Sequence, residues 1–323
     1  MASFRQNFEM GLTRRGIRVS PNPEDGCDAI LVIGGTRSIL PLWRARRRGT
    51  RIVQRLDGIN WIHRRRNTGP RHFLRAEYGN LLLSLIRSRI ATHILYQSKF
   101  AHRWWDDWYG KRDTPWSMVH NGVNLEEFRP EGPGGLPEDR CRLLVVEGSL
   151  GGGYGTGLDN ALQLGEILHR KHGLQIELVV AGNITHSHQA DVQSRASIPI
   201  VWAGALPRAR IPELDRSAQL LFSADLNPAC PNSVIEALAC GLPVVAFDTG
   251  ALSELVIGNS GRLVPYGGDP WQLQKPDVPA LAEAASEVLR NRPRFSNAAR
   301  AHAEKALDVE SMVEGYLRAL LEA

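Results

Sequence analysis

Short apolar runs alternate with amphipathic segments along most of the chain. In the first half, the apolar runs 28–35, 51–58 and 92–98 predict strands, and the helical spacing of apolar residues predicts helices at about 36–48 and 73–90. Strands that alternate with helices form a parallel sheet covered on both faces. The first half therefore predicts an α/β domain.

The same pattern restarts after residues 129–140, whose Pro and Gly content is typical of a linker. A helix is predicted at 157–173, and buried strands are predicted at 141–148, 174–182, 198–204, 218–225 and 241–248. We expect two doubly wound, Rossmann-like domains that face a cleft. The predicted bounds are 1–130 for the N-terminal domain, 131–305 for the C-terminal domain, and 306–323 for a last helix that crosses back to the N-terminal domain.

The bulk properties favour a cytoplasmic globular protein. A chain of 323 residues suits two domains, and no apolar run reaches the roughly 18–20 residues of a membrane-spanning helix. The first residues also lack the apolar core of a signal peptide. The four cysteines show neither CxxC spacing nor a metal-ligand cluster.

Positive charge is concentrated in the first half. Residues 1–130 hold roughly 23 Lys and Arg against roughly 11 Asp and Glu, whereas the whole chain has a net charge of +5. The runs 43–51 and 62–75 are the richest in arginine. They indicate peripheral contact with an anionic membrane at its inner face, a phosphorylated acceptor or a charged polymer, or else solvated helix faces. Nucleic acid is disfavoured, because no binding motif accompanies the arginines.

The stretch NPACPNSVIEALACGLPVVAFDTGALSELV, residues 227–256, is the most informative. It predicts a helix that Asn232 caps and that Gly241 ends, then a strand, and then a second helix after Thr249 and Gly250. Helix N-termini carry unpaired N–H groups and partial positive charge, so two of them at one strand edge predict an anion pocket.

Four segments occur together in a recognisable order: HNGVNLEEFRP (120–130), the glycine turn after residue 148, residues 230–256, and GNSGRLVPYGGD (258–269). Over most of residues 28–320 the chain resembles retaining GT-B glycosyltransferases of family 4. The resemblance implies a nucleotide-diphosphate sugar donor on the C-terminal domain. It also implies a glycan, lipid-linked or small hydroxyl acceptor on the N-terminal domain. Neither a cofactor nor a metal is implied, because the chain has no Asp-x-Asp cluster in these motifs.

The resemblance also assigns donor-binding residues. Glu236 corresponds to the glutamate that binds the ribose hydroxyls, and a carboxylate can accept two hydrogen bonds from a vicinal diol. Its neighbours Cys230, Pro231 and Ser233, together with Thr249 and Gly250, would line the donor site. The Asn232 amide is a predicted catalytic group that could hydrogen-bond the sugar hydroxyls, as an alternative to capping the helix.

Two departures from the family affect the donor site. Pro228 stands where relatives carry a second glutamate, eight residues before Glu236, and Asp225 is a carboxylate at a different spacing. Ser149 stands where relatives carry an arginine, and no lysine follows before Lys171.

Replacements for the two missing cations are therefore needed. The backbone of Gly151, Gly152 and Gly153 could bind phosphate, or form a lid or a plain turn. Arg208 and Arg210 are further candidates by residue type.

On the N-terminal side, Asp57 falls near the position where relatives carry a histidine beside the reacting sugar. It is either a catalytic contact or a turn residue before Gly58. Arg55, Ser98 and Lys99 are the predicted acceptor contacts.

Relatives open with a strand and a glycine-rich loop, whereas SFRQNFEMGLTRRGI (3–17) is already helical in pattern. Either the N-terminal domain has lost its first strand, or the start of the chain was assigned too late; we favour the second explanation because a sheet element is missing. The leading functional hypothesis is sugar transfer with retention of configuration. The alternative is a catalytically silent GT-B binding or scaffold protein, which Pro228 and the missing cations favour.

Overall fold

A computed structural model describes residues 2–150 and 155–322 of the protein. The chain forms two compact units: unit 1 comprises Met1–Gly122 and Asp308–Ala323, and unit 2 comprises Val123–Leu307. The sequence placed these divisions near residues 130 and 305. Each unit is an α/β domain with its own parallel sheet, as predicted.

Unit 1 holds a four-stranded parallel sheet in the order β1-β2-β3-β4. Its strands are β1 (Ala29–Ile33), β2 (Arg51–Leu56), β3 (His93–Tyr96) and β4 (Trp116–Met118). Its helical elements are α1 (Ala2–Arg14), α2 (Ile39–Arg47), η1 (Ile62–Arg64), α3 (Pro70–Leu85), the π-helical turn η2 (Ile86–Ile90), α4 (Lys99–Tyr109) and α12 (Val309–Leu321). The predicted opening helix is confirmed as α1.

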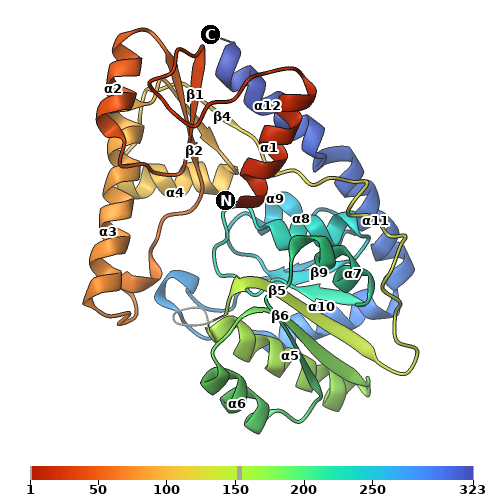
Figure 1. Cartoon of the computed structure of the whole chain (residues 1–323). Helices are drawn as coiled ribbons and strands as arrows, with labels where there is room; N and C mark the ends of the chain where they lie inside the picture. Colours follow the sequence, from red (N-terminus) through yellow and green to blue (C-terminus); the bar gives the residue numbers. More distant parts are fainter. Residues whose placement is uncertain (1, 151–154, 323) are drawn as a thin grey trace. The chain divides into compact units, whose positions relative to one another are not determined.

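Apolar residues cover both faces of this sheet. On one face, Phe4 and Phe8 of α1 pack against Tyr316 of α12, with ring centroids 4.8 and 5.3 Å from the tyrosine ring. On the other face, Leu42 of α2 and Ile86 of η2 pack together over the sheet. In Figure 1 the strands β1 and β2 lie between α2 on one side and α12 on the other. The last helix of the chain is therefore part of the core of unit 1.

Unit 2 holds a six-stranded parallel sheet in the order β10-β9-β8-β5-β6-β7. Its strands are β5 (Cys141–Ser149), β6 (Ile176–Asn183), β7 (Ile200–Gly204), β8 (Leu220–Phe222), β9 (Val244–Phe247) and β10 (Gly261–Val264). Its helices are α5 (Gly155–His172), α6 (His186–Arg195), η4 (Arg208–Arg210), α7 (Ile211–Arg216), α8 (Asn232–Ala239), α9 (Leu252–Leu255), η5 (Pro270–Gln272), α10 (Val278–Arg290) and α11 (Arg292–Ala306). This strand order is that of a Rossmann fold, and the order reverses between β5 and β8.

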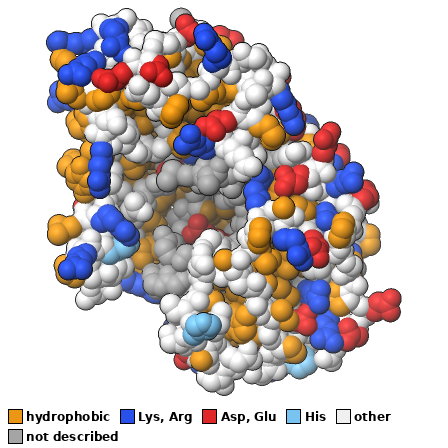
Figure 2. Space-filling view, in the orientation of Figure 1, with side chains coloured by type: hydrophobic (Ala, Val, Ile, Leu, Met, Phe, Trp, Pro, Cys, Tyr) orange, Lys and Arg blue, Asp and Glu red, His pale blue; other side chains and the backbone are white. Residues whose placement is uncertain are grey.

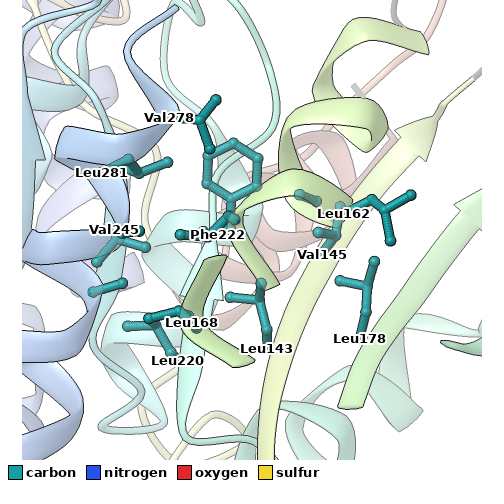
Figure 3. Close-up of a cluster of buried hydrophobic side chains, with 14 of the residues drawn as sticks. Leu143, Val145, Leu162, Leu168, Leu178, Leu220, Phe222, Val245, Val278 and Leu281 are labelled. Atoms are coloured by element: carbon teal, nitrogen blue, oxygen red, sulfur yellow. The ribbon is translucent and has the colours of Figure 1, made fainter. Parts of the chain in front are cut away.

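The buried strands of unit 2 place alternate residues on opposite faces. Leu143 and Val145 of β5 join a core under α5 and α10, whereas Leu144 joins the core under α8 and α11. Figure 3 shows Phe222 in the middle of the first core, with Val278 and Leu281 of α10 on one side of it. Because both faces are apolar, the polar side chains of these strands lie near their ends, as Arg142 and Glu177 do at the amino ends of β5 and β6.

The structure corrects some element bounds. The strand predicted at 218–225 is only three residues long, and the edge strands β4 and β10 were not predicted. The short β8 leaves residues 223–231 as a loop at the carboxyl edge of the sheet, which is where ligands bind in open α/β sheets.

Candidate functional site

Helix α8 carries the first candidate residues at this edge of unit 2. It begins at Asn232, and its N-cap is Pro231, so the prediction that Asn232 caps the helix is wrong. Pro231 fixes its own backbone near φ −71° and leaves Asn232 as the first helical residue. The predicted stop at Gly241 is confirmed, because this residue has φ +70° and the next N–H, that of Leu242, donates to Ala237 O at 2.9 Å.

Glu236 lies on the buried side of α8 and is 8% exposed. Arg208 Nε of η4 donates to Glu236 Oε1 at 3.1 Å, and the Arg208 guanidinium lies 5.0 Å from the centre of the Phe128 ring. Burial raises the pKa of Glu236, and the charge of Arg208 opposes that shift. The structure therefore places Arg208 beside the predicted ribose ligand, while Arg210 pairs with the exposed Glu213.

A second carboxyl group lies close to this pair. Asp215 of α7 is 1% exposed, and burial together with the charge of Glu236 raises its pKa well above the ordinary value. The neighbouring Cys240 thiol has a raised pKa for the same reasons, first burial and then the charge of Asp215. Burial and mutual repulsion therefore both disfavour simultaneous ionisation of Asp215 and Glu236.

The loop around Pro228 is tied to the start of α9. Ala251 N donates to Pro228 O at 2.8 Å, and Asn227 N donates to Thr249 Oγ1 at 3.4 Å. Gly250 has φ +62°, and a Cβ there would lie 2.5 Å from the Pro228 backbone. Only glycine fits this close approach, which fixes the shape of the loop that precedes α8.

The predicted anion pocket between two helix N-termini needs correction. The second of these helices, α9, has only four residues, too few to build up a helix dipole. The N-terminus of the longer α5 lies at the same edge. Its first turn packs closely against the residues after β8, since a Cβ on Gly157 would lie 2.4 Å from Ala224 O. The N-termini of α5 and α8 therefore replace the predicted pair at this edge.

Two carboxyl groups meet at the point where the strand order reverses. Glu147 lies near the end of β5, and Asp225 follows β8, the neighbouring strand. Burial and the charge of Asp225 raise the pKa of Glu147 to about 8, and burial raises the pKa of Asp225 to about 6. Glu147 Oε1 is buried and has no hydrogen-bond partner among the described residues. Two adjacent carboxylates avoid ionising together, so the pair retains a proton at neutral pH.

Sequence reasoning missed this pair. The signal was present, because Glu147 is a lone acidic residue in the otherwise apolar run LLVVEG. Asp225 was noted only for its wrong spacing from Glu236. Their meeting depends on β5 and β8 being neighbours, which the linear sequence does not display.

The other predicted donor residues lie at or near the same edge. Cys230 is buried, and Pro231 and Ser233 are partly exposed at the start of α8. Ser149 is the last residue of β5. Gly151, Gly152 and Gly153 lie outside the described residues.

The predicted acceptor residues lie in unit 1, and two of the three are buried with structural hydrogen-bond partners. Arg55 is 3% exposed, and its guanidinium donates to Tyr316 Oη and Asn121 Oδ1, each at 2.9 Å, inside the core. Ser98 is fully buried and caps α4 by accepting from Ala101 N at 3.0 Å, whereas the next residue, Lys99, is exposed.

Asp57 directly follows β2 and is partly exposed. Its backbone oxygen accepts from Trp105 Nε1 at 2.8 Å, which fixes the turn. The carboxylate is thus held at the carboxyl edge of the unit 1 sheet.

Comparison with known proteins agrees with this arrangement. The model of the family "Glycosyl transferases group 1" matches residues 144–291, which span β5 to α10. The lipopolysaccharide core biosynthesis mannosyltransferase LpsB of Rhizobium meliloti (strain 1021) is 30% identical over 262 residues, which cover 68% of this chain and 67% of LpsB. The chain belongs to the group 1 glycosyltransferases.

Solved glycosyltransferases have the same fold. Sucrose-phosphate synthase from Thermosynechococcus elongatus matches with a TM-score of 0.69 at 16% identity, over 96% of this chain and 75% of that one. Alr3699/HepE of Anabaena in complex with UDP-glucose matches with a TM-score of 0.66 at 16% identity, over 91% and 79% of the two chains. WaaG, a glycosyltransferase involved in lipopolysaccharide biosynthesis, matches with a TM-score of 0.64 at 14% identity, over 87% and 80%. This group 1 glycosyltransferase thus has the GT-B fold.

Within residues 2–150 and 155–322, no group of three or more His, Cys, Asp or Glu side chains is placed to hold a metal ion. Over the same ranges, no helix of this glycosyltransferase is long and apolar enough to cross a membrane.

Proposed function

We propose that this glycosyltransferase moves a hexose from a nucleotide-diphosphate sugar to a hydroxyl group, with retention of the anomeric configuration. Its relative LpsB is a mannosyltransferase of lipopolysaccharide core biosynthesis, and HepE was solved with UDP-glucose. Mannose is therefore the first sugar to test, and a glycan or a lipid-linked glycan is the first acceptor. We propose no cofactor beyond the donor substrate.

The observation that carries the proposal is the position of Glu236. Its carboxylate is buried at the carboxyl edge of a Rossmann sheet, where nucleotides bind in this architecture. Arg208 occupies one of its oxygens, and a carboxylate has about four lone-pair sites, so capacity remains for the two hydroxyls of a ribose. The N-termini of α5 and α8 supply N–H groups for the phosphates at the same edge.

The proposed reaction uses the donor diphosphate as the base. The bond between the anomeric carbon and the diphosphate breaks, and its electron pair leaves with the diphosphate. The acceptor oxygen attacks the same face of the sugar and passes its proton to the departing phosphate oxygen. Because Pro228 offers no carboxylate, no protein nucleophile is proposed, and stabilisation of the leaving charge is assigned to the helix N–H groups.

The carboxyl pair of Glu147 and Asp225 fits an anionic donor only when it holds a proton. A doubly ionised pair at the switch point would repel a diphosphate, whereas a neutral Glu147 can donate a hydrogen bond to it. We assign to Asp57 the corresponding contact with the reacting sugar or acceptor from unit 1.

The test is calorimetry of the purified protein with UDP-, GDP- and ADP-hexoses, including GDP-mannose. Glu236→Ala should weaken binding of the preferred donor at least tenfold, because charge-assisted hydrogen bonds contribute roughly 1.5–3 kcal/mol each. Glu213→Ala is the matched control, since Glu213 also pairs with an η4 arginine but is exposed. Equal affinity in both variants would refute the assignment of Glu236.

The same experiment tests the alternative of a catalytically silent GT-B protein. Pro228 and the absence of the family's cations favour that alternative. A donor that binds through Glu236 but shows neither transfer nor slow hydrolysis would support it. Turnover with water, released sugar being measured, would refute it.

A further inference from the structure

One surface of unit 1 takes no part in the functions assigned above. Helix α3 has a buried side, which includes Ala76, Asn80 and Leu83, and an outward side that is also apolar. The outward residues are Leu74 (68% exposed), Tyr78 (48%), Leu81 (63%) and Leu85 (38%). Their spacing of four, three and four residues places them in one stripe along the helix. When a surface helix is apolar on its outward side as well, that side normally binds another protein or a membrane.

Helix α2, which contacts η2 at the end of α3, exposes two further apolar side chains. Leu40 and Trp43, three residues apart, are 53% and 40% exposed. The two helices are tied together on this side of the sheet, because the Arg37 guanidinium, just before α2, lies 6.0 Å from the centre of the Tyr78 ring. We call the six side chains of these two helices the outer apolar face; they are Leu40, Trp43, Leu74, Tyr78, Leu81 and Leu85.

Arginines surround the outer apolar face. Arg44, Arg47, Arg71 and Arg75 are exposed on the same two helices, and the Arg47 guanidinium lies over the Trp43 ring at 3.9 Å. Between residues 29 and 105 the acidic residues are only Asp57 and Glu77, and Glu77 is paired with His63 and Arg64. Arg44 is paired with Glu24, so the excess positive charge of the face comes from the other three arginines. Figure 2 shows orange and blue side chains interspersed over α2 and α3. The face therefore carries a net positive charge as well as apolar side chains.

We infer that the outer apolar face docks on an anionic lipid bilayer. Leucines and aromatic rings insert at the boundary between headgroups and acyl chains, and arginines around them pair with lipid phosphates. The arginines favour an anionic bilayer over a second copy of the chain as the partner of this face. In a dimer through this face, the arginines of one copy would lie against those of the other. The contact would be peripheral, with α2 and α3 lying along the membrane surface.

The test is co-sedimentation of the full-length protein with vesicles of phosphatidylglycerol and phosphatidylethanolamine, compared with pure phosphatidylcholine. We expect binding to the anionic vesicles that weakens as salt is added. The double variant Leu74→Ser/Leu81→Ser should lower partitioning at least tenfold, and Arg71→Gln/Arg75→Gln should lower it by a similar factor. Ile257→Ser and Arg170→Gln are matched controls, because both residues are exposed in unit 2.

A second measurement locates the contact. Brominated lipids quench tryptophans that enter the bilayer, so Trp43→Phe should remove most of the quenching. Trp116→Phe should not, although Trp116 is 46% exposed in the same unit.

Three results would overturn the inference: no binding to anionic vesicles, binding that the α3 variants leave unchanged, or a dimer in light scattering that the same variants dissociate without any vesicle binding. Donor calorimetry on the α3 variants separates this outcome from a failure of the proposed function, since these residues lie outside the donor site.

Discussion

The proton held by Glu147 and Asp225 predicts an unusual dependence of stability on pH. Glu147 has a pKa of about 8 in the folded protein against an ordinary value of 4.5. Between these values the folded protein keeps a proton that the unfolded chain releases, so folding becomes less favourable as the pH rises. The contribution is fully present below pH 4.5 and is lost as the pH rises through about 8.

The magnitude follows from the shift. Each pH unit inside this window costs about 1.4 kcal/mol, so raising the pH from 5 to 7 should lower the free energy of unfolding by about 2–3 kcal/mol through Glu147 alone. Glu147→Gln keeps the shape of the neutral acid and cannot ionise. The variant should match the wild type near pH 5 and exceed its stability by about 2–3 kcal/mol at pH 7.

Urea denaturation at pH 5, 6, 7 and 8 measures this difference. Asp225→Asn should flatten the pH dependence in part, because burial still raises the pKa of Glu147 but the additional charge of Asp225 is removed. Glu138→Gln, at an exposed position of unit 2, should leave the curve parallel to that of the wild type. If Glu147→Gln also ran parallel to the wild type across the range, the carboxyl pair would not hold its proton and the reasoning would be refuted.

Three further substitutions test packing at the site and in each core. Gly250→Ala should lower donor affinity at least tenfold in calorimetry, because the new Cβ would lie 2.5 Å from the Pro228 backbone. Gly258→Ala is the control, since Gly258 has a similar φ of +61° but open space around it. The control should cost about 1–2 kcal/mol of stability and leave donor affinity unchanged. Phe222→Ala should lower the unfolding free energy of unit 2 by about 3–5 kcal/mol in urea denaturation, and a loss below about 1 kcal/mol would contradict the described core. Arg55→Met should destabilise unit 1 by about 3 kcal/mol, because two hydrogen bonds from a buried guanidinium are lost; unchanged melting would show that they contribute nothing.

Much of the fold could be predicted because its strands are buried on both faces. Such strands appear as continuous apolar runs, and LLVV in β5 and VVAF in β9 were found in this way. The edge strands β4 and β10 were missed because Trp-Ser-Met and Gly-Arg-Leu-Val carry no such run. The other two edge strands, β1 and β7, carry apolar runs and were predicted, so the composition of β4 and β10, and not their edge position alone, explains why they were missed.

Of the candidate site, only the parts built from contiguous residues could be predicted from the sequence. Glu236 could be placed because the helix, its stop and the next strand are contiguous. The cap was wrong because Pro231 moves the start of α8 by one residue. The contacts between Arg208 and Glu236, and between Glu147 and Asp225, join residues far apart in the chain, and both depend on tertiary structure.

The return of α12 to unit 1 has a consequence for synthesis of the protein. Tyr316 and Val313 complete the core that Phe4 and Phe8 begin, and all of unit 2 is translated between them. During translation the apolar side of α1 stays uncovered until the last helix leaves the ribosome, whereas unit 2 can fold as soon as Leu307 emerges. The order in which the ribosome releases the chain therefore favours completion of unit 2 before unit 1, and makes the nascent N-terminal segment a natural client for chaperones.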